Sequence, residues 1–258
     1  MDWTRFYELK RLSDAGNDEQ ALTGLQKMLT EAEGREDRAA ISLMIATCLR
    51  GLGRLSEARE RVQGVLGTID KESEISAWAI FSDAYLDMDE GKWSAALKKL
   101  DRLQTHFSVL LQRPENRERY EDIERKRGIA LLGLDRAKEA LPLLKRASVR
   151  REEQAVVFYC LGKCYYKLDE YEDAQKCLEQ AFNSDLDRDY ELDARYHLGL
   201  ADYRLHRYAQ AVQQFEWCLA HDSNPMVPRE FVLKGLIYAL RDSGMDREAE
   251  RYSRMLHT

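Results

Sequence analysis

Three cysteines and one histidine are the residues of this sequence whose types suit a metal ion. Cys160 and Cys164 are four residues apart and would share a helix face, while Cys177 and His197 follow later in the chain. Thiolate and imidazole groups are preferred zinc ligands. The cysteines of structural zinc sites usually lie on loops, however, and a free cysteine usually packs as a small buried hydrophobe. We therefore expect these four residues to pack rather than to bind zinc, and we predict no metal or other cofactor.

No arrangement of residues in the sequence is typical of a catalytic site. The histidines have no HExxH spacing, and the segment 51–54 (GLGR) lacks the GK[ST] that completes a phosphate-binding loop. Acidic residues are frequent, but most have Lys or Arg three or four positions away, as in ENRERYEDIERKR at 115–127. Such spacing is typical of an ion-paired, solvated helix surface. We therefore predict that the protein is not an enzyme.

The composition favours a helical, water-soluble protein. The chain of 258 residues is 44% apolar and 33% charged, with only 4 prolines and 14 glycines, which favours helices over turn-rich sheets. Its net charge of −6 gives no general attraction for nucleic acid or anionic membranes. The N-terminal residues lack the apolar core of a signal peptide, and the five cysteines fit reduced thiols. We expect a cytoplasmic, all-α protein with no nucleic-acid partner and no membrane span.

An alanine that recurs along the chain gives the spacing of an internal repeat. The intervals between successive copies are 37, 38, 44, 34, 37 and 38 residues. The copies are Ala21, Ala58, Ala96, Ala140, Ala174, Ala211 and Ala249. Apolar residues follow most of them four and seven positions later. Positions zero, four and seven lie on one helix face, which predicts that this face is buried.

A second helix is predicted before each of these alanine-bearing helices. Gly128, Gly162 and Gly199 each lie twelve residues before the alanine of their unit. Glycine destabilises a helix by up to about 1 kcal/mol relative to alanine, so its recurrence at one place indicates the close approach of a neighbouring helix. Short polar or glycine-bearing turns such as GLGRL and DSGMD lie between the two helices. Each unit is therefore predicted to be two antiparallel helices joined by a tight turn.

This pattern resembles the tetratricopeptide repeat family. The residues that carry the resemblance in the fifth and sixth units are Leu161, Gly162, Tyr165, Leu168, Tyr171, Ala174, Leu178, Ala181, Leu198, Gly199, Leu205, Tyr208, Ala211 and Phe215. The resemblance implies one all-α solenoid domain over 1–258, with about seven antiparallel helix-turn-helix repeats forming a right-handed superhelix. The expected repeats are approximately 2–34, 39–72, 75–113, 121–154, 155–188, 192–225 and 228–258.

Three segments are expected to depart from a regular repeat. The third and seventh units are predicted to carry about two extra residues in the turn between their helices. The 44-residue interval before Ala140 is predicted to hold a lengthened second helix, a turn at Pro114 and a long charged helix that runs into Gly128. Pro225 and Pro228 are predicted to break the chain between the sixth and seventh units.

The resemblance also implies a binding groove, because the first helix of each hairpin lines the concave side of solenoids in this family. The main residues expected in the groove are Tyr159, Lys163, Tyr166, Lys167, Tyr196, Tyr203 and Arg204, and those of the seventh unit are Arg229, Val232, Leu236 and Ala239. Tyrosines beside Lys and Arg suit a peptide or an amphipathic helix with acidic and apolar side chains. Alternatively, the tyrosines pack against the next hairpin and the lysines are only solvated.

We therefore expect a non-catalytic interaction module, an adaptor or co-chaperone-like scaffold that holds a peptide or helical segment of a protein partner. The carboxylate clamp of some family members is not expected, because Lys163 and Leu200 occupy places that require asparagine. The alternative function is a structural homo-oligomer, with a homodimer formed through terminal repeats. This alternative depends on the apolar residues of the terminal helices, Trp3, Phe6, Tyr7, Tyr252, Met255 and Leu256, which no polar capping helix is predicted to cover.

Overall fold

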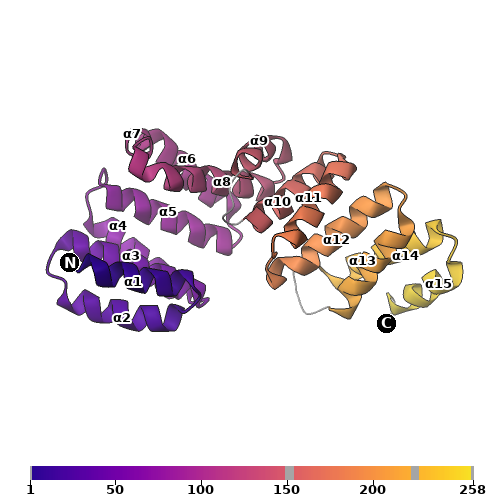
Figure 1. Cartoon of the computed structure of the whole chain (residues 1–258), viewed down its shortest axis with the longest axis horizontal. Helices are drawn as coiled ribbons and strands as arrows, with labels where there is room; N and C mark the ends of the chain where they lie inside the picture. The colour runs from indigo at the N-terminus through magenta and orange to yellow at the C-terminus, as the bar shows by residue number, and fades with distance from the viewer. Residues whose placement is uncertain (1, 149–153, 222–226, 257–258) are drawn as a thin grey trace. The chain divides into compact units, whose positions relative to one another are not determined.

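The structure is a computed structural model that describes residues 2–148, 154–221 and 227–256. These residues form helices joined by turns and short loops, and no strand occurs among them, so the all-α prediction is confirmed (Figure 1). The chain divides into two compact units, Met1–Leu134 and Asp135–Thr258. The single domain expected over 1–258 and its repeat boundaries stay predictions. The boundaries at 225 and 258 and the break at Pro225 lie outside the described residues.

The first unit consists of helical hairpins that pack in chain order. Its helices are α1 (Trp3–Asp14), α2 (Asp18–Glu31), α3 (Arg35–Gly51), α4 (Leu55–Thr68), α5 (Glu74–Asp89), α6 (Trp93–His106), α7 (Ser108–Leu111), the 3₁₀ helix η1 (Pro114–Asn116) and α8 (Arg117–Gly133). Each helix of the three hairpins α1–α2, α3–α4 and α5–α6 contacts its partner, and α2 and α4 also contact the first helix of the next hairpin. Stacking of this kind buries a continuous apolar core, which includes Leu25, Ile45 and Val62.

The second unit has the same organisation. Its helices are α9 (Ala137–Ala147), α10 (Gln154–Lys167), α11 (Tyr171–Asn183), α12 (Arg188–Arg204), α13 (Tyr208–Ala220), α14 (Arg229–Asp242) and α15 (Asp246–Met255). The hairpins α10–α11, α12–α13 and α14–α15 stack in order, and the first helices α10, α12 and α14 contact one another in turn. Phe215, Leu236 and Leu240 belong to the core of this unit.

The turns inside the hairpins all have the same backbone geometry. In the described part of the chain, seven pairs of helices are separated by three residues, and the middle residue has a positive φ. The seven middle residues are Gly16, Gly53, Gly91, Asp135, Asp169, His206 and Gly244, with φ between 59° and 81°. The longer turns predicted for the third and seventh units are therefore wrong, because residues 90–92 and 243–245 have the same length as the other turns.

The repeated alanine and glycine have the packing roles that their spacing predicts. All seven register alanines are buried. A Cβ added to Gly162 would lie 2.5 Å from Cγ of Leu178 and 3.2 Å from the carbonyl oxygen of Ala174 on the partner helix. A Cβ at Gly199 would lie 2.9 Å from the ring of Phe215. The close approach of helices predicted at these two glycines is therefore confirmed.

The second helix of the third hairpin is not lengthened, in contrast to the prediction. It ends at His106, because Phe107 leaves the helical conformation with φ −111° and ψ 21° and buries its side chain. The short helices α7 and η1 follow, and η1 begins at Pro114, where a turn was expected. The charged segment then forms α8, as predicted.

Candidate functional site

The structure places the seven predicted groove residues on the first helices α10 and α12 of the second unit. These two helices contact each other. Lys167 and Arg204 are exposed, Lys163, Tyr166, Tyr196 and Tyr203 are half-buried, and Tyr159 is only 4% exposed. Their helices are therefore adjacent, as expected, but the residues differ in how much surface they offer to a partner.

Tyr159 and Lys163 are held in a buried polar network between α10 and α12. The hydroxyl of Tyr159 donates to a carboxylate oxygen of Asp193, and Nζ of Lys163 donates to the same oxygen at 2.8 Å and to the Tyr159 hydroxyl at 2.9 Å. Nδ1 of His197 lies 3.3 Å from that oxygen. Burial opposes ionisation of Asp193, but His197 and Lys163 outweigh it and hold the pKa of this carboxyl below its usual range. Tyr159 thus braces two helices and is not the accessible anchor that was expected.

The remaining predicted cations also have acidic partners. Nζ of Lys167 lies 2.6 Å from a carboxylate oxygen of Asp135, and the guanidinium of Arg204 lies 3.6 Å from Asp169. The Arg204 guanidinium also stacks over the ring of Tyr171, 4.8 Å from its centroid. Paired cations attract a further acidic group less strongly than free ones. The basic lining expected for the groove is therefore largely neutralised within the protein.

The three half-buried tyrosines combine packing with partial exposure. Tyr166 lies against His197, Tyr196 against Phe215, and Tyr203 against Tyr208, with ring centroids about 6 Å apart in each pair. The Tyr203 hydroxyl donates to a carboxylate oxygen of Asp242 on α14 at 2.7 Å. This hydrogen bond, together with burial, raises the pKa of Tyr203 to about 12. Each of these tyrosines is therefore packed on one side and accessible on the other, and their role in binding stays a prediction.

The exposed face of α14 is not the one that the sequence analysis selected. Val232, Leu236 and Ala239 are buried in the core, whereas Phe231 and Tyr238 are 50% and 53% exposed. The error follows from the two extra residues assumed in the seventh turn. With the twelve-residue spacing of Gly162 and Gly199, Ile237 takes the packing position before Ala249, and the face of Phe231 and Tyr238 becomes equivalent to the face of Tyr196 and Tyr203 on α12.

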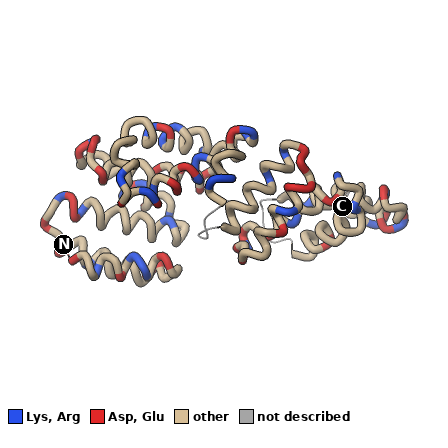
Figure 2. Tube along the Cα trace, turned by 45° about the horizontal axis from the view of Figure 1, so that its top comes forward, with Lys and Arg blue, Asp and Glu red and all other residues tan. Residues whose placement is uncertain are grey.

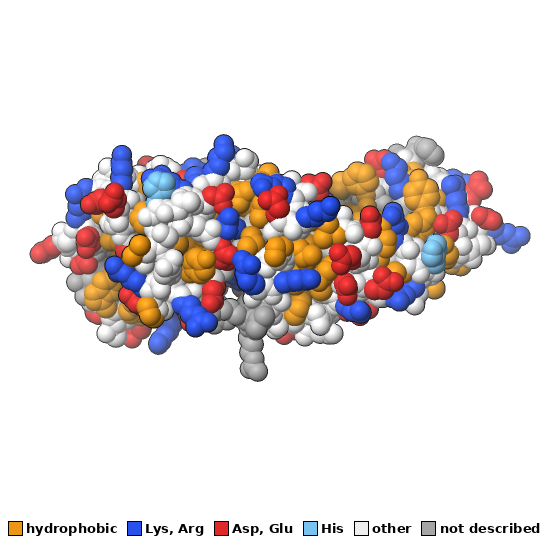
Figure 3. All heavy atoms as spheres, turned by 90° about the horizontal axis from the view of Figure 1, so that it is seen from above, with side chains coloured by type: hydrophobic (Ala, Val, Ile, Leu, Met, Phe, Trp, Pro, Cys, Tyr) orange, Lys and Arg blue, Asp and Glu red, His pale blue; other side chains and the backbone are white. Residues whose placement is uncertain are grey.

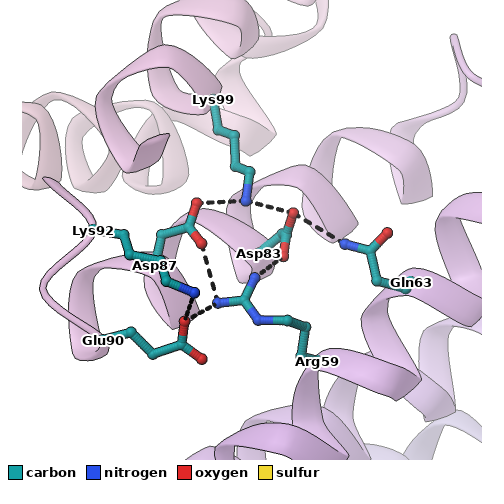
Figure 4. A network of polar contacts seen from close by, with 7 residues as sticks. All are labelled: Arg59, Gln63, Asp83, Asp87, Glu90, Lys92 and Lys99. Atoms are coloured by element: carbon teal, nitrogen blue, oxygen red, sulfur yellow. Dashed lines mark hydrogen bonds and ion pairs between the residues drawn. The ribbon is translucent and has the colours of Figure 1, made fainter. Parts of the chain in front are cut away.

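A buried ion-pair network in the first unit was not predicted. Asp83 and Asp87 lie one turn apart on α5, and both are buried (Figure 4). The Arg59 guanidinium on α4 lies 2.7 Å from Asp83 and 3.0 Å from Asp87, and Nζ of Lys99 on α6 lies 2.6 Å and 2.5 Å from the same two carboxylates. Gln63 and Glu90 complete the hydrogen bonds. Nζ of Lys92 lies 2.6 Å from Glu90, so the network, which joins three successive helices, holds three cations and three carboxylates.

The same register position in the second unit holds a buried carboxylate with weaker partners. Asp87 and Asp202 each lie nine residues before their register alanine, and Arg59 and Gln175 each follow the alanine of the preceding hairpin. Asp202 therefore accepts a hydrogen bond from Nε2 of Gln175 at 3.0 Å where Asp87 meets a guanidinium. Burial raises the pKa of Asp202 to about 6, because the nearby Arg207 offsets the effect only in part and Glu179 adds to it.

The cysteines have the packing environment that was expected. Cys48, Cys160, Cys164 and Cys218 are buried free thiols, and Cys177 is half-buried. Burial raises the pKa of Cys164 to about 12 and that of Cys177 to about 11, so both thiols are protonated at neutral pH. In the described ranges, no cluster of three or more His, Cys, Asp or Glu side chains has an arrangement that could hold a metal ion.

The described residues carry charges of both signs. Acidic and basic residues are interspersed along the tube in Figure 2 and over the face seen in Figure 3, where hydrophobic side chains lie between them. None of the helices in the described residues combines the length and the hydropathy that a bilayer crossing requires.

Comparison with known proteins agrees with the hairpin architecture. Residues 153–224 match the family model of the tetratricopeptide repeat. A Rap protein complexed with Competence and Sporulation Factor has 14% identity and a TM-score of 0.66 over 98% of this chain and 74% of its own. MamA from Desulfovibrio magneticus RS-1 has 18% identity and a TM-score of 0.53 over 76% of this chain and 100% of its own, and a MamA mutant has 18% identity and a TM-score of 0.56 over 71% and 97%. No curated protein sequence matches the chain.

The sequence resemblance, the stacked hairpins and the structural neighbours agree with one another. The left-handed turn residue, the buried register alanine and the helix-contacting glycine recur from hairpin to hairpin. Low sequence identity restricts the comparison with solved structures to the fold. The chain has the fold of these helical-repeat structures, and residues 153–224 match the tetratricopeptide repeat family model.

Proposed function

We propose that the protein is a non-catalytic interaction scaffold that binds a peptide or helical segment of a partner protein on the first helices of the second unit. The binding surface, which we call the aromatic strip, consists of Tyr166, Tyr196, Tyr203, Phe231 and Tyr238. The observation that carries this proposal is the exposure of Phe231 and Tyr238 on the face of α14 that is equivalent to the tyrosine face of α12. Large aromatic side chains on a rigid surface are typical anchors of protein interfaces.

The chemistry of the strip favours apolar and aromatic side chains of the partner. Lys163, Lys167 and Arg204 were expected to select acidic partners, but each already has a carboxylate partner. Lys234, which lies between Phe231 and Tyr238 on α14, pairs with Glu230 at 2.5 Å. We therefore propose that apolar contacts supply most of the affinity and that the paired charges at the edge supply orientation. The Rap structure, a complex with Competence and Sporulation Factor, supports a binding role for solenoids of this fold.

The test uses a double variant of the two most exposed strip residues. Phe231→Ala with Tyr238→Ala removes two aromatic anchors without touching the core, and Gln213→Ala with Gln180→Ala serves as a control on exposed sites of α13 and α11. A partner captured from native lysate with the wild-type protein is purified, and its affinity for each variant is measured by calorimetry. We expect the strip variant to bind at least about tenfold more weakly and the control to bind normally. Equal affinities would refute the assignment of the strip.

A structural homo-oligomer is the second candidate. Trp3 and Tyr7 on α1 are 49% and 55% exposed, and their rings cluster with Phe6 at centroid distances between 5.6 and 6.2 Å. An exposed aromatic cluster is typical of an interaction surface. Sedimentation velocity of the wild type and of Trp3→Ser with Tyr7→Ser distinguishes the two candidates. A dimer that is lost in this variant supports self-association, and a wild-type monomer at all concentrations refutes it.

A further inference from the structure

The first unit contains a pocket, whereas the aromatic strip belongs to the second unit. The pocket has a volume of about 620 Å³ and lies where the loop between α4 and α5 meets the end of α6 and the short helix α7. The pocket exists because Phe107 ends α6 early and redirects the chain into the segment 108–116, which interrupts the regular alternation of hairpins. The segment thereby forms one wall of the pocket.

That wall presents apolar side chains to solvent. Val109 on α7 is 77% exposed, more than any other large hydrophobic residue in the described part of the chain. Leu110 is half-buried beside it, and Phe107 closes the base with a buried ring. An exposed β-branched residue beside a concave site is available for contact with a ligand.

Besides these apolar side chains, the pocket lining contains three cations. Lys71, Arg102 and Arg113 line it, all three are exposed, and none of them has an ion pair with any residue that the structure describes. This contrasts with the paired cations of the networks around Asp83 and Asp193. Of the two carboxylates in the lining, Glu74 is engaged, because it accepts a hydrogen bond from Nε1 of Trp78 at 3.1 Å and lies 3.4 Å from Arg119.

We propose that this pocket binds an acidic linear segment of a partner protein that carries an apolar side chain. The carboxylates of the segment would pair with Lys71, Arg102 and Arg113, and its apolar side chain would cover Val109 and Leu110. Charge complementarity favours this occupant. The lining contains three cations without an ion pair in the described residues, but only one carboxylate, Glu72, that is not already engaged. A nucleic acid is a poorer fit, since its backbone requires a longer track of cations than one pocket offers.

The experiment measures binding of a defined probe, the fluorescein-labelled peptide Ser-Glu-Asp-Leu-Leu-Asp-Glu-Ser, by fluorescence polarisation. The test variants are Arg102→Glu with Arg113→Glu, which reverses two pocket charges, and Val109→Ser, which removes the apolar contact. Lys27→Glu with Lys98→Glu is the matched control, because it changes the net charge equally at exposed positions outside the pocket. Circular dichroism verifies that each variant is folded. Titrations at about 50 mM and about 500 mM salt separate charge from apolar contact.

We expect saturable binding that weakens at high salt, a loss of at least about tenfold in the double pocket variant, and a change of less than about twofold in the control. Val109→Ser is expected to weaken binding with the salt dependence retained. The proposal is overturned if the peptide shows no saturable binding up to about 1 mM, or if the pocket and control variants lose affinity equally. Tighter binding of a single-stranded RNA of the same length would also overturn it, by assigning the pocket to nucleic acid.

Discussion

Asp202→Asn is expected to stabilise the protein at neutral pH, although it removes a buried charged group that accepts a hydrogen bond. Asp202 is only 2% exposed, and its closest partner is the neutral amide of Gln175. The ionised carboxylate is therefore poorly compensated, whereas an asparagine at this position carries no charge and its side-chain oxygen still accepts the hydrogen bond of Gln175.

The magnitude follows from the pKa of the carboxyl. Burial raises this pKa from 3.8 to about 6. Since one pKa unit corresponds to about 1.4 kcal/mol, the folded state loses about 3 kcal/mol when Asp202 is fully ionised. A folded-state pKa above the unfolded value means that stability is complete below about pH 4 and is lost as the pH rises through about 6. The advantage of Asp202→Asn should therefore be absent at about pH 4 and reach its maximum above about pH 7.

Urea unfolding followed by circular dichroism between about pH 4 and pH 8 measures this difference, and hydrogen exchange of α11 and α12 amides localises it. Asp87→Asn is the matched control at the equivalent position. Because it leaves the half-buried Arg59 and Lys99 with one carboxylate fewer, it is expected to destabilise the protein by about 3 kcal/mol at neutral pH. A stability difference between Asp202→Asn and wild type that does not change with pH, or a destabilised Asp202→Asn at about pH 7.5, would refute the reasoning.

Four further substitutions test the packing and the turns of the hairpins, each by the midpoint of urea unfolding. Gly162→Ala is expected to destabilise by about 1–3 kcal/mol, because its Cβ would meet Leu178 at 2.5 Å; Gly64→Ala on an open face should instead stabilise by about 0.5–1 kcal/mol, and similar effects of the two would contradict the close approach. Tyr159→Phe removes a buried hydroxyl that both donates and accepts, so a loss of about 1–2 kcal/mol is expected, and an unchanged midpoint would exclude a bracing role. Gly53→Ala is expected to lower the free energy of unfolding by about 1 kcal/mol, because Gly53 has a φ of 72°, which strains a residue that carries a Cβ. An unchanged midpoint would show that the turn does not require this conformation.

The spacing of small residues was sufficient to predict the hairpins. A register alanine such as Ala174 and the glycine twelve residues before it are constrained by direct contact between two helices, so their positions follow from geometry within a single unit. The same twelve-residue spacing predicts which face of α14 is exposed, but only if all turns inside the hairpins have the same length. The sequence analysis allowed two extra residues in the seventh turn, which moved the expected groove face of α14 by two positions. The structure places Ile237 in the position that Gly162 and Gly199 occupy in their units.

The polar networks were harder to predict because each of them includes partners from neighbouring hairpins. Arg59, Asp83 and Lys99 come from three helices, and each lies within a segment where charges of both signs are common. The offset between neighbouring hairpins decides which Lys or Arg pairs with a given Asp. The sequence pattern of one helix does not reveal this offset. Tyr159 illustrates the same limit. Its helix position indicated the concave face, but its burial depends on Asp193 of the next hairpin.

Because the turns inside the described hairpins share one backbone geometry, one hairpin could replace another without a change in how its two helices are joined. Because the middle residue of every turn takes a left-handed conformation, each pair of helices leaves the turn with the same offset, whatever residues it carries. Glycine adopts this conformation without strain, whereas Asp135, Asp169 and His206 adopt it at a small conformational cost. Recombination that exchanges whole hairpins at these turns would therefore preserve the stacking register while it replaces the recognition residues, so binding specificity can diversify without the evolution of a new scaffold.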